Sequence, residues 1–286
     1  MWLFAVLLFG DSVTARAIPV APAETLAVTV TGIGEPVLFV PGLFGSAFGA
    51  RRIAAPLATA GFQLITMEPL GVGRSSRPRG ADYSLAAQAH RIAAALDTLG
   101  VGPVVAVAHS LGGAIAFRLA LERPDLIRAI VSIEGGPAEE ATTPGFRLAM
   151  RFVTVIKALG GPRVIRAEVH RNLRSASGDP SWVTDDVVDG YTRDAALHFD
   201  AAMDAFRGMA ASREPWSLRD RLEAIACPVV LLLGAADHKS GVRTEELALL
   251  RQALPQLAID SIPGAGHFIH EERPGAVVDA VRRVGG

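Results

Sequence analysis

Short apolar runs alternate along most of the chain with longer segments that carry the periodicity of amphipathic helices. The runs at residues 37–40 and 104–108 contain no polar side chain, which is typical of strands buried on both faces of a parallel sheet. Helices are predicted between the runs; Ser84, for example, is a capping residue before a helix that extends to about Leu99. The alternation predicts an α/β fold, with a mostly parallel central sheet and helices on both of its faces.

This alternation is interrupted in the middle of the chain. Between residues 138 and 215 the sequence carries no strand signal, and its helix-like runs are separated by Gly and Pro. The pattern favours an inserted, all-helical cap over one end of the sheet. The predicted domains are an N-terminal segment at 1–24, the first part of the α/β core at 25–137, the cap at 138–215 and the second part of the core at 216–286.

Composition narrows the function classes. Half of the 286 residues are apolar, a fifth are charged, and 28 Lys and Arg face 29 Asp and Glu. This balance gives no electrostatic reason to expect a nucleic-acid partner. The single cysteine, Cys227, excludes an intrachain disulfide, and no metal-ligand spacing or glycine-rich phosphate loop occurs. We therefore predict no metal and no cofactor.

The N-terminal residues carry an ambiguous targeting signal. Residues 2–9 are apolar, but this run is too short to cross a bilayer, so no stable membrane span is predicted. The sequence Ala-Arg-Ala at 15–17 resembles a signal-peptide cleavage site, whereas no Lys or Arg precedes the apolar run. Both a cytoplasmic and an exported location stay open.

The sharpest local signal is the serine that follows the apolar run at 104–108. Ser110 lies in an Ala-x-Ser-x-Gly sequence, where Ala108 and Gly112 are small enough for an abrupt turn from a strand into a helix. Such a turn exposes the serine Oγ at the end of the strand and places the backbone N–H of Leu111 at a helix N-terminus. This arrangement is a nucleophile elbow.

Other groups that a serine nucleophile needs come after other predicted strands. Asp237, His267 and Leu43 each follow an apolar run, and the carboxyl ends of parallel strands meet at one edge of a sheet. An imidazole can accept the serine proton, a carboxylate can orient the imidazole, and backbone N–H groups can bind an oxyanion. The order serine, aspartate, histidine along the chain is compatible with this chemistry.

These motifs make the chain similar to α/β-hydrolase-fold serine hydrolases that carry a helical cap, over nearly all of residues 25–284. The resemblance rests on four segments: 108–113, 71–75, 234–237, and 264–267 with Glu-Arg-Pro at 272–274.

By position, the resemblance implies a catalytic triad. Ser110 is the expected nucleophile, His267 the expected base and Asp237 the acid that orients it. Glu134 is the alternative acid, because it ends the strand after the elbow strand, where some family members take their acid.

The resemblance also implies that the backbone N–H groups of Leu43 and Leu111 form the oxyanion hole. Two departures from the family pattern weaken any inference of the substrate by analogy. Pro-Gly at 41–42 replaces the usual His-Gly before the oxyanion residue, and Glu68 precedes the loop at 71–75 where an Asp is usual. Neither change removes a catalytic group.

We expect a carboxylic ester hydrolase that acts through an acyl-enzyme on Ser110, with a small, apolar acyl compound as its substrate. The same triad also suits cleavage of a carbon–carbon bond in a vinylogous diketone, opening of a lactone, or perhydrolysis. An arginine-lined site under the cap favours carbon–carbon cleavage, and an apolar site favours esters. A non-catalytic receptor for small ligands is the alternative from another class. The oligomeric state is not predicted.

Overall fold

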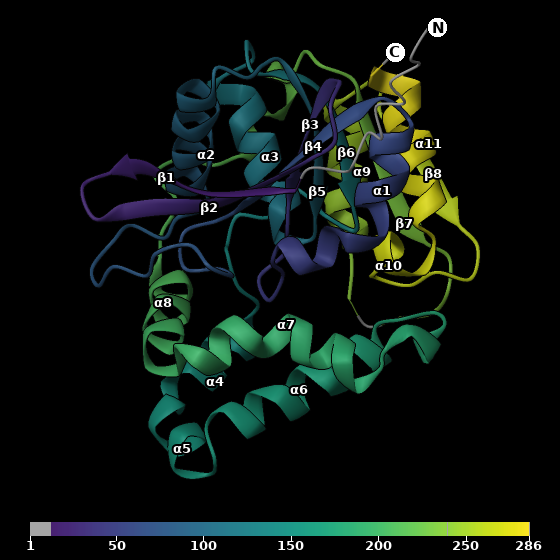
Figure 1. Ribbon diagram of the computed structural model, residues 1–286. Helices are drawn as coiled ribbons and strands as arrows, with labels where there is room; N and C mark the ends of the chain where they lie inside the picture. The colour runs from purple at the N-terminus through teal and green to yellow at the C-terminus, as the bar shows by residue number, and fades with distance from the viewer. Residues whose placement is uncertain (1–12, 239, 286) are drawn as a thin grey trace, which may run out of the picture.

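The computed structural model describes residues 13–238 and 240–285, and its centre is an eight-stranded sheet (Figure 1). The strand order is β1-β2-β4-β3-β5-β6-β7-β8. The β1–β2 and β2–β4 pairs are antiparallel, and the remaining pairs are parallel, as the buried apolar runs predicted. The strands are β1 (Thr14–Ala21), β2 (Glu24–Thr31), β3 (Glu35–Val40), β4 (Phe62–Glu68), β5 (Val104–His109), β6 (Ile127–Ile133), β7 (Val229–Gly234) and β8 (Ala258–Ile262).

Helices cover both faces of the sheet. One buried cluster joins α1 and α11 to strand residues such as Phe39 and Val107, and the other joins α2, α3 and α9 to residues such as Leu38 and Ala106. Successive side chains of a strand point to opposite faces, so strands that are apolar throughout serve both clusters. The helices of the core are α1 (Arg51–Thr59), α2 (Leu85–Leu99), α3 (Leu111–Glu122), α9 (Thr244–Ala253), α10 (Ile269–Glu272) and α11 (Pro274–Gly285), with short 3-10 helices η1 (Ala47–Ala50) and η3 (Arg219–Ala224).

A helical cap is inserted between β6 and β7. No strand occurs in residues 134–228, all of which the structure describes. In Figure 1 the cap helices form a layer of their own below the core, and α5 lies at the side farthest from the sheet. The cap consists of α4 (Pro144–Arg151), α5 (Val153–Ala158), α6 (Pro162–Ser175), η2 (Pro180–Trp182), α7 (Asp185–Leu197) and α8 (Phe199–Ala211).

Both ends of the cap insertion are tied to Arg118, a fully buried side chain on α3. Its guanidinium donates to the carbonyl oxygen of Ala138 at 2.9 Å and to Glu139 at 3.2 Å, and it forms an ion pair with Glu214 at 3.1 Å. The Glu214 carboxylate also accepts the backbone N–H of Leu85, at the start of α2, at 2.7 Å. The two ends of the cap are therefore attached to helices of the core by buried polar groups.

The edge strand β1 was not predicted. It pairs only with β2, Ile18 is its only buried residue, and its apolar run at 17–21 contains Pro19, which argues against a strand except at the edge of a sheet. The Ala-Arg-Ala sequence at 15–17 lies within this strand, whereas the apolar run at 2–9 lies outside the described residues. Among the described helices, none has the length and apolar character that crossing a membrane requires.

Candidate active site

The elbow folds as the sequence predicts, with Ser110 between β5 and α3. Its backbone has φ 53° and ψ −115°, a strained conformation that L-residues rarely adopt outside functional turns. Gly112 lies so close to β3 that a Cβ there would overlap the carbonyl oxygen of Val40. The Ser110 N–H donates to the carbonyl oxygen of Ile133 at 2.9 Å, which ties the turn to β6. Backbone packing therefore sets the position of the nucleophile.

The loop after β3 lies directly against this elbow. A Cβ added to Gly42 would lie 3.3 Å from the Cβ of Ser110 and 3.1 Å from Nδ1 of His109. The N–H of Gly45 donates back to the carbonyl oxygen of Gly42 at 2.9 Å, which closes a tight turn around Leu43. The structure therefore brings Leu43 into the neighbourhood of the serine, and its role in an oxyanion hole stays a prediction.

Glu68 is a buried carboxylate that joins this loop to the loop at 71–75 by hydrogen bonds. Its Oε1 accepts the N–H of Ala47 at 2.7 Å, and its Oε2 accepts the N–H of Arg74 at 2.5 Å. Burial raises the pKa of Glu68, and the two backbone N–H groups offset part of that rise. A Cβ at Gly73 would overlap the carboxylate, so glycine is required there. The departure from the usual Asp thus keeps a carboxylate that joins two loops of the site.

The backbone of His267 is held on two sides, in a loop between β8 and α10. Its N–H donates to the carbonyl oxygen of Ala176 at 2.7 Å, and its own carbonyl oxygen lies 3.1 Å from Nε2 of His109, the neighbour of Ser110 in sequence. The rings of His109 and His267 are 4.8 Å apart between centroids. Burial, with smaller contributions from His109 and His238, lowers the pKa of His267 well below its ordinary value. The imidazole is therefore neutral at pH 7, the form that a general base needs.

Glu272 connects the loop that carries His267 to the cap. Its Oε1 accepts the N–H of Gly266 at 3.0 Å, and its Oε2 accepts the N–H groups of Gly178 and Asp179, both at 2.8 Å. Gly178 and Asp179 follow α6 in the chain. One buried carboxylate therefore holds both the residue before His267 and a segment of the cap. The resemblance singled out the motif that contains Glu272 but gave this residue no role.

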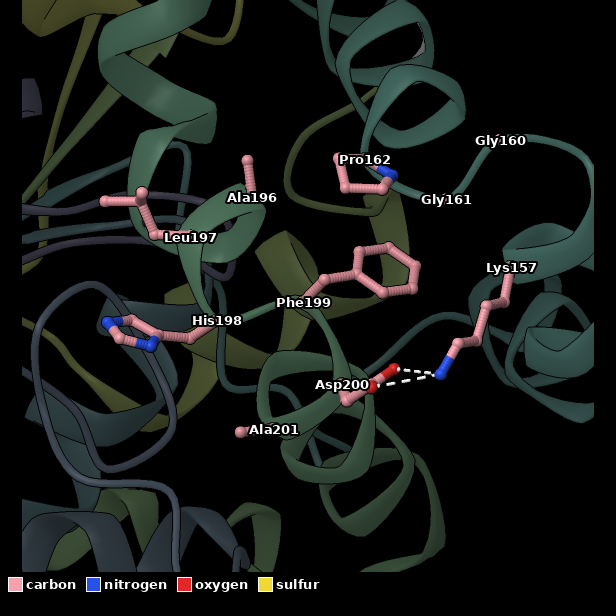
Figure 2. A pocket seen from close by; sticks show the side chains of 10 residues that line it. All are labelled: Lys157, Gly160, Gly161, Pro162, Ala196, Leu197, His198, Phe199, Asp200 and Ala201. Atoms are coloured by element: carbon pink, nitrogen blue, oxygen red, sulfur yellow. Dashed lines mark hydrogen bonds and ion pairs between the residues drawn. The ribbon is translucent and has the colours of Figure 1, made fainter.

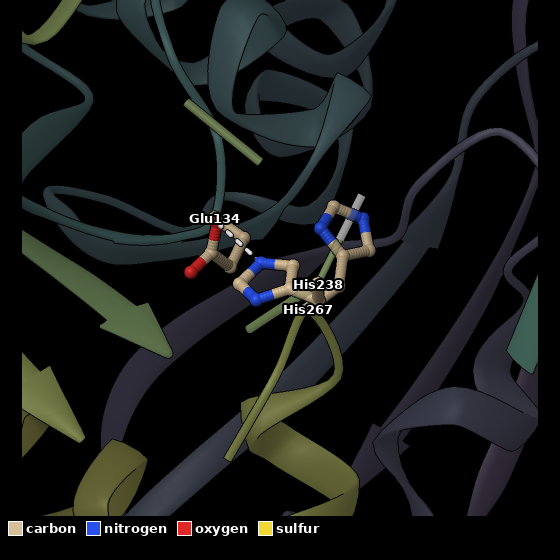
Figure 3. Close-up of side chains that lie close together, drawn as sticks. All are labelled: Glu134, His238 and His267. Carbon is tan, nitrogen blue, oxygen red and sulfur yellow. Dashed lines mark ion pairs between the residues drawn. The ribbon is translucent and has the colours of Figure 1, made fainter. Parts of the chain in front are cut away.

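Glu134, rather than Asp237, is the carboxylate that lies beside His267 (Figure 3). A carboxylate oxygen of Glu134 and one ring nitrogen each of His238 and His267 lie within 4.8 Å of one another. Glu134 is buried with φ 50°, its Oε1 accepts the N–H of Gly234 at 2.5 Å, and its Oε2 is 3.5 Å from Nε2 of His238. Burial raises the pKa of Glu134. Asp237 is exposed, and Nδ1 of His267 has no hydrogen-bond partner among the described residues. The structure thus brings the alternative acid to His267.

His238 is a further residue of the site that was not predicted from the sequence. Its Nδ1 lies 2.8 Å from the carbonyl oxygen of Ala236, and its ring centroid lies 6.3 Å from that of His267. The signal that could have revealed it is its position directly after Asp237 and β7, at the edge where the site forms. Two imidazoles and a carboxylate are also a donor set that zinc accepts, with bonds of about 2.0–2.2 Å, so these side chains would have to close in to hold an ion.

Comparison with known proteins identifies the family. The family model described as the alpha/beta hydrolase fold matches residues 35–274. This chain belongs to the alpha/beta hydrolase fold family. The family resemblance and the fold class that the sequence predicted are therefore confirmed.

Similar proteins of this family carry names of hydrolases. The chain is 28% identical to the mouse protein named sn-1-specific diacylglycerol lipase ABHD11 over 258 residues, which are 86% of this chain and 79% of the mouse protein. It is 27% identical to the putative carbamate hydrolase RutD of Klebsiella pneumoniae (strain 342) over 237 residues, 82% and 85% of the two chains. A solved structure of a thermophilic esterase from Thermogutta terrifontis has the same fold, with a TM-score of 0.75 at 24% identity over 94% of this chain and 97% of that one.

The cap of this α/β hydrolase packs closely on the loop after β3. Phe44 in that loop, Phe146 on α4 and Phe206 on α8 form edge-to-face pairs with ring centroids 5.4–5.9 Å apart. The space left between the loop and the cap is a cavity of about 20 Å³. Its lining is mostly apolar or glycine, with Arg77 and Asp194 as the charged residues. The space beside the site is therefore apolar and nearly filled.

A much larger cavity, of about 590 Å³, lies within the cap (Figure 2). It is lined by Lys157 and by residues 160–162 and 196–201, none of which belongs to the predicted site. Lys157 and Asp200 form an ion pair across it at 2.7 Å. This space therefore lies away from the residues of the predicted site.

Proposed function

We propose that this protein hydrolyses a carboxylic ester or a related acyl compound through an acyl-enzyme on Ser110. The observation that carries the proposal is the strained backbone of Ser110, held between the loop of Leu43 and the loop of His267. Strain of this kind persists where the surrounding structure maintains it, and it is concentrated at functional sites. The hydrolase names of similar proteins support the same reaction class.

In this mechanism His267 removes the Oγ proton as Ser110 attacks the acyl carbon. The N–H groups of Leu43 and Leu111 bind the oxyanion, and each such donor typically lowers the barrier by about 3–4 kcal/mol. The imidazolium then gives its proton to the leaving alcohol. Water attacks the acyl-enzyme with the same imidazole as base, which releases the acid and restores the serine.

The sequence and the geometry point to different residues as the acid that orients His267. The family resemblance favours Asp237, whereas burial and the short distance to His267 favour Glu134. We assign the role to Glu134 because its oxygen lies close to His267 without any rearrangement of the loop after β7.

An apolar acyl group suits this site better than a charged diketone. An arginine-lined site would favour carbon–carbon cleavage, whereas the lining beside the loop of Leu43 is mostly apolar or glycine, with Arg77 and Asp194 as its charged residues. The relative named as a diacylglycerol lipase also supports an ester of a fatty acid as substrate. The apolar acyl chain would lie against Phe44 and Phe206, and these two side chains would have to move apart to admit it, because the cavity between the loop and the cap is only about 20 Å³.

The first experiment combines labelling and turnover. Purified protein is treated with a fluorophosphonate probe, the adduct is mapped by mass spectrometry, and hydrolysis is measured on p-nitrophenyl esters of increasing chain length. We expect an adduct on Ser110, turnover that depends on acyl length, and loss of both in a folded Ser110→Ala variant. Turnover retained by Ser110→Ala would contradict the mechanism. An adduct without turnover on any ester would favour the receptor alternative.

A further inference from the structure

The outer side of the cap carries an exposed apolar stripe. Leu148 lies on α4, Phe152 between α4 and α5, Val155 on α5 and Leu159 directly after α5, at intervals of four, three and four residues. Their exposed fractions are 55%, 56%, 51% and 73%. Most of the large exposed apolar side chains of the described residues lie on the cap rather than on the core. We call these four residues the cap stripe.

The cap stripe is not the face that holds these helices in place. Phe146, Met150 and Val153, on the same two helices, are buried or partly buried against the main core cluster. Phe146 also contacts Phe44 and Phe206 beside the active site. The two helices are therefore apolar on two sides, and only the inner side is covered by the rest of the described chain.

Basic side chains flank the cap stripe, and three of the five pair with acidic residues from other parts of the chain. Residues 144–167 contain five basic side chains and no Asp or Glu, although the whole chain has a net charge of −1. Arg151 and Arg163 form no ion pair within the described residues, and Lys157 pairs with Asp200. The other basic residues of the segment are Arg147, which pairs with Glu140, and Arg166, which pairs with Asp185 and Asp189.

The large cavity of the cap opens beside the same surface. Lys157 lines it at the end of α5, and Leu197, which is 70% exposed, lines it at the end of α7 (Figure 2). Figure 1 places α5 at the side of the cap farthest from the sheet. The exposed apolar surface thus includes Leu197 in addition to the cap stripe.

We propose that this face of the cap docks on the surface of an anionic lipid bilayer. Exposed apolar side chains between basic ones are the pattern of helices that lie in a membrane interface, with their apolar side at the headgroup–acyl boundary. Basic residues near such a surface gain from its negative potential. A second copy of this chain fits less well, because a two-fold interface would bring the same basic segments together. The docking goes beyond the proposed reaction and is measured without any substrate.

Vesicle binding of the full chain tests the proposal. Protein is sedimented with vesicles of phosphatidylcholine alone and with vesicles that contain 30% phosphatidylglycerol. We expect binding to the anionic vesicles, at least tenfold weaker binding to the neutral ones, and weakening by added salt. Absence of binding to both vesicle types overturns the proposal.

Variants locate the binding surface. Phe152→Ser combined with Leu159→Ser should weaken vesicle binding by about tenfold or more, because both side chains would lie in the interface. Ile33→Ser is the matched control, since Ile33 is 70% exposed on a turn of the core. Arg151→Gln should weaken binding by about fivefold, the equivalent of roughly 1 kcal/mol.

The variants should keep the melting temperature and the turnover of a soluble p-nitrophenyl ester, which separates docking from folding and from the proposed reaction. Equal vesicle binding by the wild-type protein and the Phe152/Leu159 variant would overturn the proposal, as would equal loss in the Ile33 control. A wild-type dimer in light scattering that the double variant abolishes, without vesicle binding, would assign the surface to a second copy instead.

Discussion

The core and the cap position their functional side chains in different ways. In the core, Ser110 and Glu134 both have positive φ, and buried backbone groups hold them at the ends of adjacent strands. In the cap, α4 and α5 lie on the core through apolar contacts and expose a second apolar side. Local backbone geometry therefore determines the core site, whereas the cap depends on its attachment to distant residues.

That attachment is made by a small number of buried polar contacts. Besides Arg118 and Glu272, Tyr191 on α7 donates its hydroxyl to Glu271 on α10 at 2.6 Å, and Arg51 pairs with the same carboxylate at 2.5 Å. Burial raises the pKa of Glu271, and Arg51 opposes that rise. Buried ion pairs add little net stability, but they are expensive to break from one side. They therefore fix one position of the cap more than they strengthen the fold.

The largest expected effect lies in the core and separates the two candidate acids. Glu134→Gln should lower kcat by about 10³–10⁴-fold, because an uncharged neighbour no longer stabilises the imidazolium of His267. Asp237→Asn should change kcat by less than about threefold, since Asp237 is exposed. Ester turnover of both variants gives the ranking. The opposite ranking would mean that the loop after β7 rearranges with substrate and brings Asp237 to His267.

The next effect tests whether the cap depends on its buried ties. Arg118→Met should lower the free energy of unfolding by about 3 kcal/mol, because the buried carboxylate of Glu214 and the partly buried one of Glu139 both lose their ion pair with Arg118. Arg123→Met, near the end of the same helix, is the control: Arg123 is partly exposed and pairs with Asp97, so the change should be small. Urea unfolding measures both, and equal losses would contradict the distinction between buried and exposed ties.

The same contrast explains what could be predicted from the sequence. The elbow at Ser110 and the parallel sheet depend on local patterns, so both were predicted. The contact between His238 and Glu134 depends on how two loops from different strands meet, and no pattern of spacing encodes it. The edge strand β1 escaped prediction because a strand paired on one side needs no apolar face. Glu272 and Arg118 are charged residues whose burial becomes evident only when the cap and the core are placed together.

The loss of folding stability at low pH should come from histidines of the core and not from those of the cap. Burial lowers the pKa of His270 to about 3, with a smaller contribution from His267, and burial also lowers the pKa of His109 and of His267. Below about pH 6.5 these three histidines therefore bind more protons in the unfolded state than in the folded one, so the stability that they contribute is present above that pH and is lost as the pH falls. Protonation of His270 in the unfolded state alone should lower the free energy of unfolding by about 1.4 kcal/mol at pH 5.5.

Thermal unfolding between pH 7.5 and pH 5 measures this loss. His270→Phe should remove about 1.4 kcal/mol of the loss at pH 5.5, because the side chain then has no proton to bind in the unfolded state. His198→Gln, on the exposed surface of the cap, should leave the pH dependence unchanged. A His198 variant that alters the profile as much as the His270 variant would place the acid sensitivity outside the core.

The smallest expected effect tests the contact through which the cap reaches the base. Glu272→Gln should lower kcat by about fivefold, roughly 1 kcal/mol of barrier, because an amide cannot accept all three N–H groups and the residue before His267 is held less firmly. KM should change by a smaller factor, since the acyl cavity lies elsewhere.

Asp179→Asn is the control, because the Asp179 side chain is exposed and only its backbone N–H contacts Glu272. If both variants lose melting temperature and kcat to the same extent, Glu272 has a purely structural role. If only Glu272→Gln loses kcat, and its melting temperature is kept, Glu272 positions the cap and the catalytic base together.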